Sequence, residues 1–140
     1  MKYALIGCGR IATNHMKAAV NNELEIAAVC DVLPEKMEAL LAKHELENDE
    51  TIKRYTDYKE MIAEVKPELV SIATESGIHA EIALYCIDNG VNLIIEKPMA
   101  MSIADADEII KRSEEKGVVV SACHQNRFNV AIQELRKAVE

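Results

Sequence analysis

The sequence has no excess of positive charge, no long apolar run and no closely spaced pair of cysteines. Its 16 Lys and Arg against 24 Asp and Glu give a net charge of −8. This balance argues against a nucleic-acid surface, because binding to phosphate backbones needs clustered cations. No stretch approaches the roughly 18 consecutive apolar residues of a membrane span, and Gly7 and Gly9 interrupt the N-terminal apolar run that a signal peptide would need. We therefore expect a soluble, cytoplasmic protein with no nucleic-acid or membrane partner.

The cysteines and histidines show no spacing typical of metal ligands. The four cysteines are Cys8, Cys30, Cys86 and Cys123, and no C-x-x-C pair occurs among them. We expect buried free thiols, since isolated cysteines in apolar runs behave as small hydrophobic residues. The four histidines are His15, His44, His79 and His124. They share no ligand spacing with the cysteines, so the sequence predicts no metal site.

Strand and helix patterns alternate along the whole chain. With 140 residues, 49% hydrophobic and 29% charged, the composition is that of one globular domain. The predicted strands are 2–7, 25–30, 52–55, 69–73, 91–95 and 118–122. The predicted helices are 10–21, 34–44, 57–65, 79–88, 102–116 and a final one that runs to about Ala138. Because crossover connections are right-handed and parallel sheets need helices on both faces, this α/β pattern predicts a doubly wound six-stranded parallel sheet of order 3-2-1-4-5-6.

A glycine-rich turn, Gly7-Cys8-Gly9-Arg10-Ile11-Ala12, joins the first predicted strand to the first predicted helix. In a dinucleotide-binding turn Gly7 permits the tight bend, Gly9 lets the backbone approach a pyrophosphate, and Ala12 lets the helix pack closely on the strand. The phosphates then lie on the free N–H groups at the helix start, which are those of Arg10 and Ile11 here. The context predicts a Rossmann domain over residues 1–140.

Asp31 ends the second predicted strand, roughly 20 residues beyond the glycine turn, where an acidic residue accepts hydrogen bonds from the adenosine ribose. The alternative is that Asp31 caps the helix that begins near Pro34. A carboxylate about 4 Å from a 2′-phosphate would repel it by about 4 kcal/mol at an effective dielectric constant of 20. No arginine follows Asp31, and Lys36 is the nearest cation. The sequence therefore favours NAD over NADP.

Other polar residues follow the carboxyl ends of the later strands, where open α/β sheets bind their ligands. These segments are Thr74–His79, Glu96-Lys97-Pro98 and His124–Arg127. In Glu96-Lys97-Pro98, the proline restricts the backbone beside two opposite charges. These charges either face a nicotinamide and a substrate hydroxyl or lie at a solvated strand end. Spacing alone does not separate these two readings.

Taken together, the glycine turn with His15, Thr74 with His79, and Glu96-Lys97-Pro98 resemble the N-terminal half of a dehydrogenase family. This family acts on sugars and inositol and includes glucose–fructose oxidoreductase, inositol dehydrogenase and MocA. The resemblance covers essentially all 140 residues. The family's Thr-Pro-Asn-x-x-His pattern appears here as residues 74–79 without the proline and the asparagine, which puts the contacts of that asparagine in doubt.

Residues 124–138 narrow the resemblance to the UDP-N-acetylglucosaminuronate 3-dehydrogenases of bacterial surface-polysaccharide (lipopolysaccharide, O-antigen) synthesis. Those enzymes oxidise the sugar 3-hydroxyl with NAD. The resemblance implies that this domain serves an NAD-dependent dehydrogenase of a UDP-sugar uronate. The alternatives are a dehydrogenase of another sugar or of inositol, and a non-catalytic NAD-binding module that regulates a partner.

The resemblance also assigns residue roles. Lys97 would be the catalytic lysine, which polarises the reacting hydroxyl and also lies beside the cofactor, and Glu96 would bind the nicotinamide ribose. Thr74 and Asn126 would contact the cofactor, and Arg127 would either order the substrate loop or be buried as a structural residue. His79 would lie near the nicotinamide ribose or at a satisfied edge of the core. For His15 the choice is between packing and a cofactor contact.

Members of the family carry a second domain that covers the nicotinamide and supplies further catalytic side chains. We expect this C-terminal substrate domain to be missing from the chain, which ends at Glu140. The 140-residue chain alone should then be inactive. Apolar surface exposed around its last helix should promote self-association, so we expect a homo-oligomer.

Overall fold

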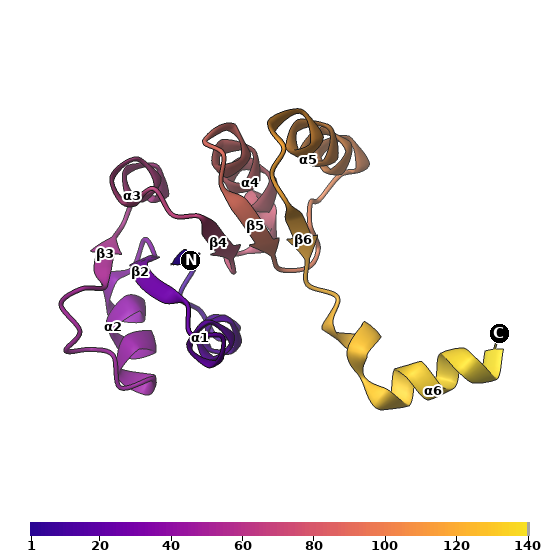
Figure 1. Cartoon of the computed structure of the whole chain (residues 1–140), viewed down its shortest axis with the longest axis horizontal. Helices are drawn as coiled ribbons and strands as arrows, with labels where there is room; N and C mark the ends of the chain where they lie inside the picture. The colour runs from indigo at the N-terminus through magenta and orange to yellow at the C-terminus, as the bar shows by residue number, and fades with distance from the viewer. Residues whose placement is uncertain (140) are drawn as a thin grey trace.

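A six-stranded parallel sheet runs through the computed structural model, which describes residues 1–139 (Figure 1). Its strands are β1 (Lys2–Ile6), β2 (Glu25–Cys30), β3 (Lys53–Tyr55), β4 (Leu69–Ile72), β5 (Asn92–Ile95) and β6 (Val120–Ala122). The strand order is β3-β2-β1-β4-β5-β6, and every neighbouring pair is parallel. The predicted doubly wound Rossmann sheet and its order are confirmed.

The helices begin and end at residues whose chemistry suits a terminus. They are α1 (Ala12–Asn21), α2 (Pro34–Lys43), α3 (Tyr58–Val65), α4 (His79–Asp88), α5 (Ile103–Lys116) and α6 (Val130–Val139), with short 3-10 helices η1 (Ser76–Ile78) and η2 (Gln125–Phe128). Asp57 caps α3 by accepting a hydrogen bond from the Lys59 N–H. Ser102 caps α5 through the Asp105 N–H, as predicted, and Gly117 ends α5 with a positive φ of 66°.

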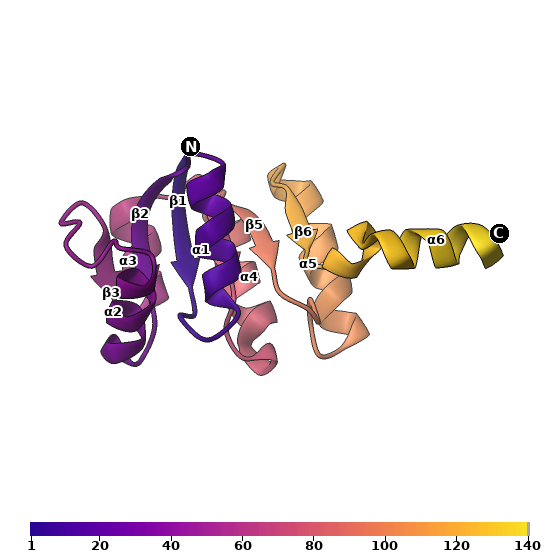
Figure 2. The ribbon, with the colours of Figure 1, turned by 90° about the horizontal axis from the view of Figure 1, so that it is seen from below.

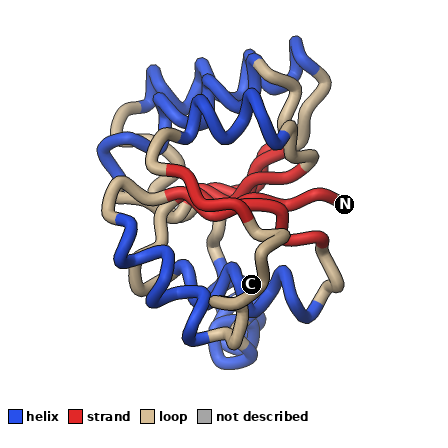
Figure 3. The backbone as a smooth tube through the Cα atoms, turned by 90° about the vertical axis from the view of Figure 1, so that its left-hand side faces the viewer, coloured by secondary structure: helices blue, strands red, loops and turns tan. Residues whose placement is uncertain are grey.

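Two helix layers cover the sheet and enclose two apolar cores (Figure 3). On one face α1 and α2 bury Met16 and Leu41 against Leu5. On the other face α3, α4 and α5 pack around Ile72 and Leu93. Both faces of the inner strands are therefore apolar, which is why the predicted strands read as continuous hydrophobic runs.

The last helix differs from the others, because α6 extends away from the sheet instead of covering it (Figure 2). A helix through about Ala138 was predicted, but every described residue from His124 onward is exposed. The exposed fraction of Phe128 is 80% and that of Leu135 is 60%. The expected apolar surface around the last helix is thus present.

The element boundaries shift by a few residues where turns take over. The first helix begins at Ala12 rather than at residue 10, because residues 7–11 form the glycine turn. The last strand begins at Val120 rather than at residue 118, since the Val118 N–H donates to the Ser113 carbonyl at the end of α5.

Among the described helices, none combines the length and apolar character needed to cross a membrane.

Candidate functional site

The glycine turn is the most constrained backbone at the carboxyl edge of the sheet. Gly7 has a φ of +90°, and a Cβ built on it would lie 2.6 Å from the Ala73 carbonyl carbon. Its N–H donates to the Cys30 carbonyl over 2.8 Å. Gly7 is therefore fitted between the ends of β2 and β4, where no side chain has room. This is the tight turn that the sequence predicts at this position.

The start of α1 leaves backbone donors free. Helix α1 begins with Ile11 as its N-cap residue, without a side-chain cap and without an acidic residue in its first turn. Within residues 1–139, the N–H groups of Gly9, Arg10 and Ile11 have no hydrogen-bond acceptor. A Cβ on Gly9 would meet nothing within 4 Å, so the space above it is open. Free donors at a helix N-terminus with open space in front suit a pyrophosphate.

Asp31 is held beside this turn by two backbone donors. One carboxylate oxygen accepts the Cys8 N–H over 2.8 Å, and the other accepts the Leu33 N–H over 3.0 Å. The N-cap residue of α2 is Leu33, so Asp31 precedes the cap rather than forming it. Each carboxylate oxygen keeps a second lone pair for a hydroxyl donor. The geometry thus orients the carboxylate and leaves it able to bind a ribose.

A cavity of about 260 Å³ lies in front of these groups. Residues from the ends of β1, β2 and β4 line it, and its polar side chains include those of Asp31, Lys36 and Thr74. Thr74 is half-buried there, and its hydroxyl donates to the Glu75 carbonyl over 3.2 Å. We name Gly7, Gly9, Asp31 and Thr74 the glycine side of the carboxyl edge.

Two cysteine thiols lie at the base of the glycine side and are neutral at ordinary pH. Burial, and secondarily the charge of Asp31, raise the pKa of Cys8 to about 12. Burial and the same carboxylate also raise the pKa of Cys30 to about 12. Both thiols are buried and free, as predicted. They add no negative charge that would oppose a phosphate at the turn.

The other predicted residues lie toward β5 and β6, outside the lining of that cavity. We name Glu96, Lys97, Cys123 and Asn126 the lysine side. Lys97 follows Glu96, which is the first residue after β5. It is exposed and precedes Pro98 through a cis peptide bond. Its ammonium group has no ion-pair partner in the part of the chain that the structure describes.

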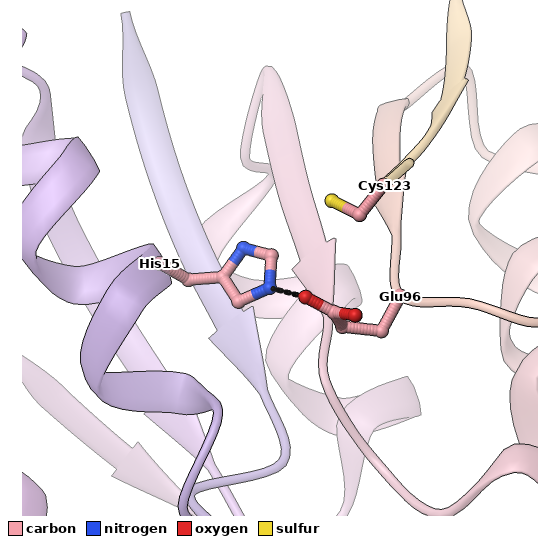
Figure 4. A group of neighbouring side chains, drawn as sticks. All are labelled: His15, Glu96 and Cys123. Carbon is pink, nitrogen blue, oxygen red and sulfur yellow. Dashed lines mark hydrogen bonds and ion pairs between the residues drawn. The ribbon is translucent and has the colours of Figure 1, made fainter. Parts of the chain in front are cut away.

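His15 and Glu96 form a pair that joins α1 to the end of β5 (Figure 4). The His15 Nε2 and a Glu96 carboxylate oxygen are 2.9 Å apart, and their side chains are only 9% and 12% exposed. His15 therefore does more than pack, because it holds the carboxylate predicted to bind a ribose. Sequence spacing gave no sign of this pair, since the two residues are 81 positions apart.

His79 is enclosed by two carbonyl groups. Its Nδ1 lies 2.8 Å from the Pro98 carbonyl oxygen and its Nε2 lies 3.1 Å from that of Thr74. The residue is 1% exposed. This burial is consistent with a residue at the edge of the core, one of the two predicted roles. His79 ties the loop after β4 to the turn after Lys97.

Asn126 and Arg127 are exposed in η2. None of residues 1–139 buries the Arg127 side chain. Its main chain accepts a hydrogen bond from the Gln133 side chain, and its own N–H donates to His124. Three other residues also line the cavity. The sequence singled out Lys36 only as the cation nearest Asp31. It gave no signal for Thr56 and Tyr58.

Comparison with known proteins gives a consistent result. Residues 1–124 match the oxidoreductase family described by its NAD-binding Rossmann fold. The inositol 2-dehydrogenase of Salmonella typhimurium is 26% identical over 100% of this chain, and the D-glucoside 3-dehydrogenase of Escherichia coli is 29% identical over 99%. The WlbA dehydrogenase of Bordetella pertussis, solved in complex with NADH and UDP-GlcNAcA, superposes with a TM-score of 0.86 and 30% identity over 99% of the chain.

The chain spans about two fifths of the length of each of these proteins. It covers 41% of the inositol dehydrogenase, 39% of the glucoside dehydrogenase and 42% of the WlbA chain. The similarity therefore concerns one part of each relative.

Proposed function

This chain belongs to the oxidoreductase family with an NAD-binding Rossmann fold, and we propose that it is the cofactor-binding domain of a dehydrogenase that oxidises the 3-hydroxyl of a UDP-N-acetylglucosaminuronate-type sugar nucleotide. The cofactor is NAD. The observation that carries the proposal is the pair of opposite charges, Glu96 and Lys97, at the end of β5 and along the same sheet edge as the glycine turn. A module that only bound the cofactor would not need a lysine on the substrate side.

The glycine side would hold the adenosine half of the cofactor. The free N–H groups of Arg10 and Ile11, and that of Gly9, would donate to the pyrophosphate. The Asp31 carboxylate, already oriented by two backbone donors, would accept the ribose hydroxyls. Thr74 would line the passage toward the nicotinamide.

The lysine side would hold the reacting groups. When bound, NAD supplies the electrophilic carbon that accepts a hydride. Glu96, held by His15, would accept hydrogen bonds from the nicotinamide ribose. The Lys97 ammonium would donate to the reacting oxygen and stabilise the negative charge that develops there as the hydroxyl proton leaves for a base, before the C–H bond gives up its hydride. Asn126 would contact the cofactor from η2, and His79 would act only through the main chain that it fixes.

The proposed substrate is tested by an activity assay. A protein containing this chain and its substrate domain should reduce NAD with UDP-N-acetylglucosaminuronate, and the same assay with myo-inositol and glucose tests the other sugar dehydrogenases of the family. Lys97→Met should lower kcat by at least about 100-fold, because removing one donor to a developing oxyanion costs about that much. Turnover that survives in Lys97→Met would overturn the role of the lysine. Faster turnover of inositol would overturn the proposed substrate.

The isolated chain should bind NAD and show no turnover. Holding the reacting carbon against the nicotinamide and excluding water lowers a barrier by about 7–11 kcal/mol, and Lys97 is exposed here. Calorimetric titration with NAD and NADP, followed by an assay of the same sample, tests both statements. Failure to bind NAD at millimolar concentration would argue against a competent glycine side.

A further inference from the structure

Three metal-ligating side chains converge at the lysine side from distant parts of the sequence. His15 comes from the first turns of α1, Glu96 follows β5, and Cys123 follows β6. The His15 ring nitrogen, a Glu96 carboxylate oxygen and the Cys123 Sγ all lie within 4.8 Å of one another. Figure 4 shows the three side chains pointing into the same space between α1 and the ends of the two strands.

The main chain fixes the positions of the two strand-end residues. The Glu96 N–H donates to the Ile72 carbonyl over 2.9 Å, and the Cys123 N–H donates to the Ile95 carbonyl over 2.8 Å. Both bonds continue the parallel ladder beyond the ends of the strands. His15 is carried by a helix whose inner face is buried. The three groups are therefore placed by rigid elements, as a preorganised ligand set requires.

The donor set is one that zinc takes in proteins. Nitrogen, carboxylate oxygen and thiolate sulfur bind Zn²⁺ at about 2.0–2.3 Å, and three protein ligands leave a fourth position for water. Such bonds place tetrahedral ligand atoms about 3.3–3.7 Å apart. The His15–Glu96 distance of 2.9 Å would have to widen slightly and the sulfur would have to move inward by about 1 Å.

The charges of the site also lack a cation. No Lys or Arg forms an ion pair with Glu96 among residues 1–139. A divalent cation would balance one carboxylate and one thiolate, so the assembled site would be neutral.

We propose that His15, Glu96 and Cys123 form a binding site for a thiophilic divalent cation of the zinc class. On binding, the Cys123 thiol loses its proton to solvent and its sulfur bonds the metal. His15 coordinates through the Nε2 lone pair with its ring proton on Nδ1, and the carboxylate of Glu96 takes the third position. The hydrogen bond between His15 and Glu96 is replaced by bonds to the metal.

Occupation of this site should oppose cofactor binding. This part rests on the proposed function, in which Glu96 receives the nicotinamide ribose. A metal-bound Glu96 has fewer lone pairs for that ribose, and the cation would lie where the nicotinamide half approaches the lysine side. The site would then make the domain sensitive to free zinc.

The binding itself is tested without NAD. Titration of the chain with ZnCl₂ in a calorimeter should give one ion per chain with release of about one proton, since a thiol must be deprotonated. Co²⁺ in place of Zn²⁺ should give a thiolate-to-cobalt charge-transfer band. Cys123→Ser and His15→Gln should each weaken Zn²⁺ binding by at least about 100-fold, because a direct ligand matters no less than an outer-shell partner.

Two further histidines supply the controls. His44→Gln removes a histidine that lies on the far end of α2 and should leave Zn²⁺ affinity unchanged. His124→Gln separates the proposed site from a surface chelate made by neighbouring residues Cys123 and His124. A loss of affinity in His124→Gln with none in His15→Gln would overturn the proposal, as would wild-type binding in Cys123→Ser. Circular dichroism of each variant confirms that the fold is kept.

A second titration separates this inference from the proposed function. NAD affinity is measured first in the presence of a chelator and then at saturating Zn²⁺, where it should fall by about tenfold or more. Tight Zn²⁺ binding without any NAD binding would contradict the proposed function and leave the metal site standing. NAD binding without Zn²⁺ binding would contradict the metal site alone.

Discussion

The glycine side and the lysine side of the same sheet edge are built in different ways. On the glycine side the backbone fixes the geometry, since Asp31 receives two backbone hydrogen bonds and Gly7 fits closely against Ala73. On the lysine side Lys97 and Asn126 are exposed, and α6 extends away from the sheet. Backbone geometry is therefore sufficient to shape the glycine side. The shape of the lysine side depends on the surface that packs against its exposed residues.

The largest expected effect concerns the buried thiols and alkaline pH. Burial raises the pKa of Cys8, Cys30 and Cys86 to about 12, from 9.0 for an ordinary thiol. The unfolded chain therefore releases these protons first, and the stability that the neutral thiols contribute is complete below pH 9 and is lost as pH rises from 9 toward 12. Each thiol accounts for at most about 1.4 kcal/mol per pH unit in that window. Urea unfolding at pH 8, 9 and 10 should therefore show a steep fall in the free energy of unfolding.

Substitutions of single cysteines show how much each thiol contributes to the pH dependence of the free energy of unfolding. Cys86→Ala should reduce the slope by about one third, because one of three equivalent groups is removed. Cys123→Ala, from the half-exposed thiol of the lysine side, should change it less. A free energy of unfolding that stays constant from pH 8 to pH 10 would show that the thiols of the glycine side are not shielded as the structure indicates.

The two glycines of the turn should separate folding from cofactor binding. Gly7→Ala places a Cβ 2.6 Å from the Ala73 carbonyl carbon at a φ of +90°, so we expect a loss of about 3 kcal/mol or more in the free energy of unfolding. Gly9→Ala meets no atom within 4 Å and should cost less than about 1 kcal/mol. Its Cβ would instead obstruct the pyrophosphate and weaken NAD binding by tenfold or more. Thermal unfolding and NAD titration of both variants test this division.

Cofactor preference is the next smaller effect. Asp31→Ser removes the negative charge that would repel a 2′-phosphate, so the preference for NAD over NADP should narrow by about tenfold, or 1.4 kcal/mol. Asp31→Asn is the matched variant, because its side-chain oxygen can still accept the Cys8 N–H. Both variants should shift the ratio of the two dissociation constants in the same direction. An unchanged ratio would remove Asp31 from the ribose.

The sequence predicted the glycine side well because its signals are local. The turn, Asp31 and the strand order follow from residue types and spacing within single strand–helix units, and the structure bears out the resulting fold. For the lysine side, the family resemblance predicted the residues and their roles but not how they are arranged. The pairing of His15 with Glu96 and the approach of Cys123 join residues from three elements, so only the closed sheet brings them together. The direction of α6 was also beyond prediction, since its amphipathic pattern shows an apolar face but not what covers that face.

The smallest expected effect on stability belongs to that exposed face. Leu135 is 60% exposed on α6, whereas Leu41 on α2 is fully buried. Leu41→Ala should lower the free energy of unfolding by about 3 kcal/mol through loss of burial and the resulting cavity. Leu135→Ala should change it by less than about 0.5 kcal/mol, because the side chain gains little from folding of the isolated chain. If the apolar face instead mediates self-association, Leu135→Glu should shift sedimentation toward the monomer while leaving Tm at low protein concentration unchanged. A large loss of stability in dilute Leu135→Ala would show that α6 packs against the sheet and that the lysine side is closed by the chain itself.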